Sequence, residues 1–91
     1  YLKPEVVINA VAKYYDLPPE KLSSKLRSAD IAKARNVAMW ICRDYLEMNL
    51  DKIGSYFGGR THSTVLHGCN NVDDDPKIKK EAEEIIKLIT S

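Results

Sequence analysis

Apolar residues recur along this chain at the three- and four-residue spacing of helices, and no stretch alternates between apolar and polar residues as a strand does. The first helix is predicted to begin near Pro4, since proline suits a first helical turn. It ends before Pro18 and Pro19, which lack the N–H that helical hydrogen bonding needs. A short helical turn over residues 19–22 can follow. The expected apolar face of the first helix consists of Val7, Ile8, Val11, Tyr14 and Tyr15.

The most regular apolar stripe predicts a long helix that begins after Ser28. Ser28 is a favourable N-cap, and Asp30 in the first turn complements the helix dipole. Trp40 is expected on the outer face, where it packs against another helix of this domain or against a neighbouring domain. The expected buried face consists of Ile31, Ala34, Val37, Ala38, Ile41, Cys42 and Tyr45, and the opposite face of Lys33, Asn36, Trp40 and Arg43.

Three further helices are predicted in the C-terminal half. Asn49 can cap a short helix over residues 50–57, which Gly58–Gly59 ends because glycine accepts a left-handed backbone. Another helix begins at Thr61 or His62, for which Thr61 is a good N-cap, and runs to about Val72. Asp75 and Pro76 begin the last helix as an N-cap followed by a first-turn proline. Its expected buried face consists of Ile78, Ala82, Ile85, Ile86 and Ile89. The expected fold class is therefore all-α, with five or six helices.

Composition narrows the class of protein. With 91 residues, 44% of them hydrophobic and 30% charged, the whole chain is expected to form one small globular domain with a single core. There is no apolar run long enough for a membrane span and no signal peptide at Tyr1, so we expect a cytoplasmic location. A first residue that is not Met indicates a fragment of a longer protein. Cys42 and Cys69 are expected to be reduced, buried thiols.

The net charge of +1 does not by itself indicate a nucleic-acid partner, but the charge is unevenly distributed. Residues 21–60 hold eight Lys or Arg and four Asp or Glu, whereas both flanking segments carry an acidic excess. This basic stripe, which Arg60 closes, favours contact with phosphates.

The segment over residues 50–72 has the organisation of a helix-turn-helix, since a short helix, a glycine-containing turn and a second helix follow one another. On the second helix the apolar residues Val65, Leu66, Cys69 and Val72 fall on one side. Uncharged donors and acceptors fill the opposite side: Ser63, Thr64, His67, Asn70 and Asn71. Such groups suit the reading of base edges in a major groove, while Arg60 and the helix N-terminus would hold the flanking phosphates.

The same residues resemble a known family. The runs Ile53-Gly54, Phe57-Gly58-Gly59-Arg60 and His62 to His67 are similar to the C-terminal DNA-binding domain (domain IV) of bacterial replication initiators of the DnaA type. Residues 22–39 also resemble that domain's basic loop and long helix. The resemblance implies a Trp-repressor-like fold that binds double-stranded DNA at the DnaA boxes of a replication origin. It also implies a longer parent protein with an ATP-binding domain, associated with the bacterial nucleoid.

Residue roles follow from this resemblance and from the basic stripe. Arg27 is expected to enter the minor groove, and the major-groove base contacts are expected from Thr61, His62, Ser63 and Thr64. Contacts with the DNA backbone are expected from Lys25, Lys33, Arg35, Asn36, Arg43, Arg60 and His67. Neither catalytic residues, nor a metal site, nor a cofactor is expected.

The chain departs from the family pattern at five positions. Thr61 stands where the family usually has Asp, which predicts weaker discrimination at one base of the box. Leu26 replaces a frequent basic residue, which predicts lower non-specific affinity. The other departures are Ala34 for a common Pro, Asn36 for a common Gln and Asn71 for a usual charged residue.

Other functions remain open at this point. A transcription regulator or a mobile-element protein can use the same helical domain, since a fold does not fix a biological role. An interaction module without a nucleic-acid partner would explain the helices but not the uncharged polar face. A phosphate-loop enzyme would need a fuller glycine pattern with a lysine after a strand. The spacing of His62, His67 and Cys69 matches no standard zinc pattern.

Overall fold

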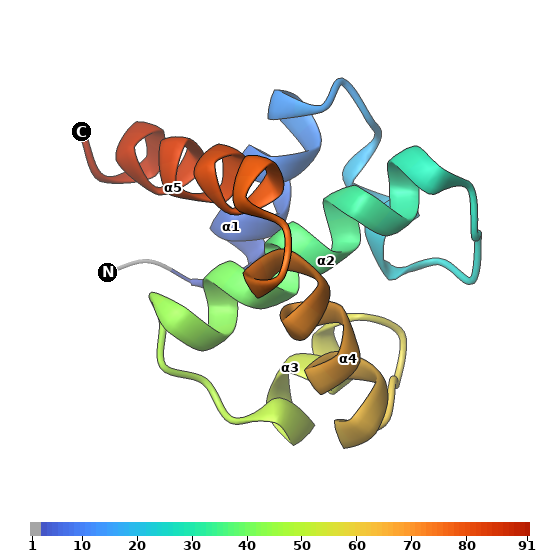
Figure 1. The fold of residues 1–91 in the computed structure, drawn as a ribbon. Helices are drawn as coiled ribbons and strands as arrows, with labels where there is room; N and C mark the ends of the chain where they lie inside the picture. The colour runs from blue at the N-terminus through green and yellow to red at the C-terminus, as the bar shows by residue number, and fades with distance from the viewer. Residues whose placement is uncertain (1–2) are drawn as a thin grey trace.

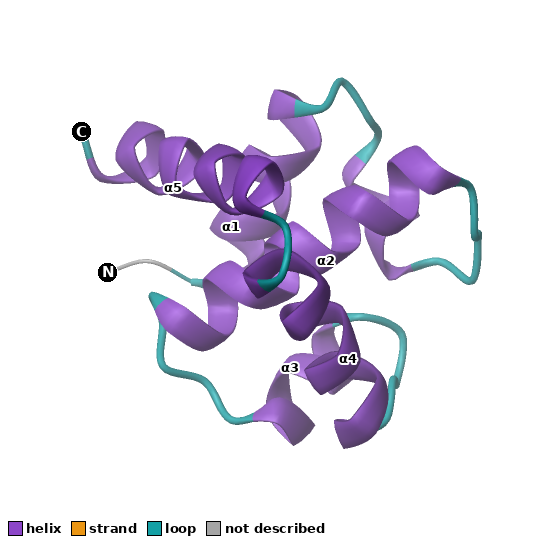
Figure 2. Ribbon diagram, in the orientation of Figure 1, coloured by secondary structure: helices purple, strands orange, loops and turns teal. Residues whose placement is uncertain are grey.

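A computed structural model describes residues 3–91, which fold into five α-helices and one 3-10 turn without any strand (Figures 1 and 2). The elements are α1 (Pro4–Tyr14), η1 (Pro19–Ser23), α2 (Ala29–Asp44), α3 (Leu50–Tyr56), α4 (His62–Asp73) and α5 (Pro76–Thr90). The predicted all-α class is confirmed, and each predicted helix is present close to its expected bounds. The expectations about a signal peptide and a longer parent protein, both drawn from Tyr1, lie outside the described residues.

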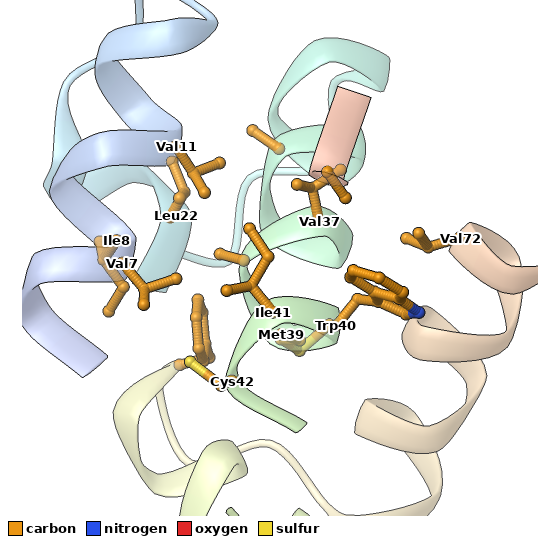
Figure 3. Close-up of a cluster of buried hydrophobic side chains, with 14 of the residues drawn as sticks. Val7, Ile8, Val11, Leu22, Val37, Met39, Trp40, Ile41, Cys42 and Val72 are labelled. Atoms are coloured by element: carbon orange, nitrogen blue, oxygen red, sulfur yellow. The ribbon is translucent and has the colours of Figure 1, made fainter. Parts of the chain in front are cut away.

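Helix α2 runs through the centre of the molecule, with α1 and α5 on one side and the α3–α4 pair on the other (Figure 1). Five successive α2 residues, 38–42, are all buried, so this part of the helix is covered on every face rather than along one stripe. The one-sided stripe predicted for α2 was therefore incomplete, because Met39 and Trp40 also belong to the core (Figure 3). Tyr45, expected at the end of the buried stripe, is exposed because it lies beyond the last turn of α2.

Trp40 packs within this domain, which confirms the first of the two expectations for it. Its indole Nε1 donates a hydrogen bond to Asp73 Oδ1 at 2.8 Å. The other carboxylate oxygen of Asp73 accepts from Arg43 Nη2, also at 2.8 Å. Because Asp73 is the last residue of α4, these two bonds fix the C-terminal end of α4 to α2.

The turn between α3 and α4 is closed around one carbonyl group. Gly54 O accepts hydrogen bonds from the backbone N–H groups of Phe57, Gly59 and Arg60, at 3.0 to 3.1 Å. Gly58 and Gly59 have φ angles of 78° and 74°, so the expected left-handed glycine stop is confirmed. The geometry of this turn sets the angle at which α4 leaves α3.

Helix α5 is tied to the rest of the molecule by polar contacts as well as by its apolar face. Tyr15 donates a hydrogen bond to Glu81 at 2.7 Å, and Lys33 forms an ion pair with the same carboxylate at 3.1 Å. Tyr14, expected on the buried face of α1, is instead exposed and donates to Glu84 at 2.8 Å. The phenol can bond at the surface while its ring covers apolar neighbours, so the helical spacing of Tyr14 did not require burial.

None of the described helices is long and apolar enough to cross a membrane.

Candidate nucleic-acid interface

The polar face predicted for α4 is exposed along its whole length. His62, Ser63, Thr64, His67, Asn70 and Asn71 are all exposed, while Val65, Gly68, Cys69 and Val72 are buried. Leu66, which was expected to face the core, is 39% exposed and borders the polar face. Sequence periodicity therefore identified the two sides of α4, apart from this residue at the boundary.

Gly68 is a position that sequence reasoning missed. Helix α2 crosses α4 here so closely that a Cβ on Gly68 would lie 2.6 Å from both Asn36 Oδ1 and Met39 Cε. The signal was present in the sequence, since a glycine inside a predicted helix often marks a close approach. This crossing places Asn36 against the middle of α4.

The N-terminal end of α4 is capped by Thr61. Its Oγ1 accepts a hydrogen bond from the backbone N–H of Thr64 at 3.3 Å, and it lies 3.0 Å from Thr64 Oγ1. The predicted capping role of Thr61 is confirmed. The next residue, His62, is exposed, and its Nδ1 lies 3.7 Å from Asp51 Oδ1 of α3.

A second group of predicted residues lies on the connection between η1 and α2, residues 24–28, which we call the basic arm (Figure 2). Lys25, Leu26 and Arg27 of the basic arm are exposed. The arm borders a hollow of about 460 Å³, which is lined by Lys25, Arg27, Arg35, Gly58, Gly59, Arg60 and Thr64. Four of the lining residues are cationic and none is acidic, so the hollow is suited to an anion such as a phosphate group. The tertiary structure thus brings the basic arm and the start of α4 together.

Arg60 is held in the wall of this hollow. Its Nη2 donates to Ser24 O at 2.7 Å, and its Nη1 donates to Phe57 O. Burial lowers the pKa of Arg60 below its ordinary value. Because Arg60 is half-buried and bonded to two carbonyls, it is less free to reach a phosphate than the sequence suggested.

Arg35 departs furthest from its expected place, being only 7% exposed. Its Nε donates to Leu22 O at 2.8 Å, and its Nη2 donates to Ser24 O at 3.0 Å and to Leu26 O at 2.9 Å. Burial, together with the nearby charge of Arg60, lowers the pKa of Arg35. The guanidinium group is directed at the protein backbone, which differs from the exposed position expected for a phosphate ligand.

The remaining residues predicted to contact the DNA backbone are His67, Asn36, Arg43 and Lys33. His67 is exposed on α4, and Asn36 is half-buried where α2 crosses α4 at Gly68. Arg43 is half-buried and pairs with both Asp44 and Asp73. Lys33 is not brought to this surface, because its ammonium group pairs with Glu81 and lies 5.2 Å from the centre of the Tyr15 ring.

The two cysteines lie in the core, as expected. Burial raises the pKa of Cys42 to about 12 and that of Cys69 to about 11, so both thiols are protonated at neutral pH. Within residues 3–91, no cluster of three His, Cys, Asp or Glu side chains has the geometry to hold a metal ion.

Comparison with known proteins finds a matching helix-turn-helix family and related replication initiators. Residues 4–72 match the family described as "Bacterial dnaA protein helix-turn-helix". The chain is also 37% identical over 89 residues to the chromosomal replication initiator protein DnaA of Neisseria meningitidis serogroup C and to that of Neisseria gonorrhoeae. Each alignment covers 93% of this chain but 17% of the relative, so the chain spans about a sixth of the length of these proteins.

Proposed function

Since this chain belongs to the bacterial DnaA helix-turn-helix family, whose members bind DNA in replication initiation, we propose that it is the part of a longer initiator that recognises DnaA boxes in double-stranded DNA. The observation that carries the proposal is the pairing of the exposed polar face of α4 with the basic arm across one cationic hollow. The two parts would read the major and minor grooves at the same site.

Helix α4 supplies the major-groove reader. Ser63 and Thr64 offer hydroxyl donors and acceptors, His62 offers imidazole nitrogens, and the methyl group of Thr64 can meet a thymine methyl. All three side chains are exposed in the first turn of α4, which is the part of a recognition helix that meets base edges. His67, one turn further along, would lie against the backbone of one strand.

The basic arm supplies the minor-groove reader. Arg27 is exposed at its tip, and a guanidinium group suits the negative potential of a narrow minor groove. Lys25, Arg27 and Arg60 line the hollow between the arm and α4, where a phosphate of the intervening DNA backbone would be neutralised.

The parent protein would carry the remaining functions of an initiator. We propose that it includes an ATP-binding domain and acts in the bacterial cytoplasm at the nucleoid. This rests on the length of the relatives and on their names.

Duplex binding by the purified chain tests the proposal. Fluorescence anisotropy at physiological salt should show a DnaA-box duplex bound about 10³-fold more tightly than a scrambled duplex of the same composition. His62→Ala should cost about 1–3 kcal/mol on the box and little on the scrambled duplex. Lys80→Ala on the exposed surface of α5 is the control and should change neither. Equal affinity of the unmodified chain for both duplexes would overturn the proposal.

A further inference from the structure

We propose that Arg35 is a positioning residue for DNA recognition: its buried guanidinium group holds the basic arm in the place from which Arg27 can read the minor groove. The inference rests on the proposed DNA-binding function and departs from the phosphate contact expected from the sequence.

The basic arm has few other means of holding its position. Residues 25–30 are all exposed, including Leu26 at 49%, so no apolar packing fixes this segment between buried Leu22 and buried Ile31. An exposed segment of this length would ordinarily sample many conformations. Its order must come from hydrogen bonds to its backbone.

Arg35 supplies several of those hydrogen bonds from one side chain. Its Nε and Nη2 bond to the carbonyl oxygens of Leu22, Ser24 and Leu26, which are alternate residues of the chain entering and forming the arm. Arg35 is the only buried charged side chain of the part of the chain that the structure describes. Its charge is balanced by these three carbonyl dipoles, without an ion pair among the described residues. A buried charge of this kind is strongly destabilising unless its partners stay in place, so the arm and Arg35 hold each other.

The Ser24 carbonyl links this arrangement to the helix-turn-helix. It accepts from Arg35 on α2 at 3.0 Å and from Arg60 in the turn before α4 at 2.7 Å. Ser23, the last residue of η1 before the arm, adds a second bond to the helix-turn-helix, since its Oγ donates to Tyr56 O at 3.1 Å. The arm therefore cannot shift relative to the start of α4 without breaking charged hydrogen bonds.

Substitution by lysine separates the geometry of Arg35 from its charge. The planar guanidinium group presents several N–H donors in fixed directions, whereas lysine keeps the charge on one flexible ammonium group. A direct phosphate contact would keep its charge attraction in Arg35→Lys, and any loss would be independent of Arg27. A positioning role would be lost, because one ammonium group cannot hold three carbonyls in the same arrangement.

The first experiment is a double-mutant cycle on the DnaA-box duplex with Arg35→Lys and Arg27→Ala. Arg35→Lys alone should weaken box binding about tenfold or more, since it loses hydrogen bonds from a charged group. In the Arg27→Ala background, Arg35→Lys should weaken box binding little further, because the side chain that it positions is already absent. Box binding by Arg35→Lys equal to that of the unmodified chain, or additive losses, would overturn the proposal.

The second experiment needs no DNA. Trypsin should cleave after Lys25 and Arg27 several times faster in Arg35→Lys than in the unmodified chain, because the freed arm opens locally. Arg43→Lys, the same change elsewhere on α2, should leave the rate at these two bonds unchanged.

Arg60→Lys, which loosens the arm from its other side, should raise that rate even if Arg35→Lys fails to fold. An unchanged rate in Arg60→Lys, or in a folded Arg35→Lys, would overturn the positioning role. If the unmodified chain does not prefer the box, the proposed function fails, while this experiment still reports on the arm.

Discussion

Thr61 and Thr64 form a closed pair at the start of α4, with their hydroxyl oxygens 3.0 Å apart and Thr61 Oγ1 accepting from the Thr64 N–H. Thr64, a proposed base reader, is thus bonded directly to Thr61, the residue that caps α4. A DNA base that bonds to Thr64 Oγ1 must either displace the Thr61 hydroxyl from it or bond to Thr64 Oγ1 at the same time as Thr61 does. Substitutions at Thr61 should therefore change recognition as well as helix capping.

Thr61→Asp should sharpen recognition at one cytosine-bearing position of the box. A carboxylate accepts from the amino group of cytosine and repels the acceptors of the other bases, so discrimination there should rise by about 1–3 kcal/mol. Thr61→Asn is the matched control, because Asn caps a helix about as well but carries no charge. Competition with single-base variants of the duplex measures the effect. An unchanged preference at every position in Thr61→Asp would show that Thr61 serves only as the cap.

Gly58 and Gly59 should differ in their tolerance of alanine although both have positive φ angles. Each substitution carries the cost of a left-handed backbone, about 1–2 kcal/mol. At Gly58 the new Cβ would also lie 2.5 Å from Ser23 O, whereas at Gly59 it would meet nothing within 4 Å. Gly58→Ala should therefore have the lower free energy of unfolding in urea titrations, and equal losses would contradict the close approach.

Asp73→Asn should destabilise the domain at neutral pH by about 1 kcal/mol or less, because its ion pair with Arg43 is partly exposed. The hydrogen bond from Arg43 chiefly lowers the pKa of Asp73 below its ordinary 3.8, despite the opposing effect of burial. A lowered pKa gives stability that is present above pH 3.8 and is lost as the pH falls through the lower value of the folded state. The difference in unfolding free energy between the unmodified chain and Asp73→Asn should therefore shrink in acid.

Asp74→Asn provides the control for that measurement. Asp74 is the exposed C-cap of α4, and no side-chain hydrogen bond of Asp74 occurs within the described residues. Its substitution should leave the acid dependence of stability unchanged. If both variants behave alike, the bonds of Asp73 to Trp40 and Arg43 contribute nothing specific to stability.

Two lysines predicted to contact the DNA backbone should behave differently. Lys25→Ala should weaken binding to every duplex and reduce the salt dependence by about one unit of slope, since Lys25 lines the cationic hollow. Lys33→Ala should leave binding and its salt dependence unchanged, because Lys33 pairs with Glu81 on α5. Its cost in stability should stay within about 1 kcal/mol. A reduced salt slope in Lys33→Ala would place Lys33 in the interface after all.

Much of this protein could be predicted from the sequence because the relevant interactions are local. Helical spacing, the caps at Asn49, Thr61 and Asp75, and the paired glycines after Phe57 each depend on residues a few positions apart. The two faces of α4 follow from the same periodicity. These features determined the fold class and the exposed polar helix.

The roles of Arg35, Lys33 and Trp40 depended on the tertiary structure. A charged residue inside a helix ordinarily faces solvent, and nothing near Arg35 in sequence indicates that the carbonyls of Leu22 and Ser24 would fold over it. Residues 37–42 of α2 are all buried, so the periodicity of this part of the helix could not separate a buried face from an exposed one. Which partner each of these side chains meets was decided by the packing of η1, α4 and α5 around α2, because those contacts join residues far apart in the chain.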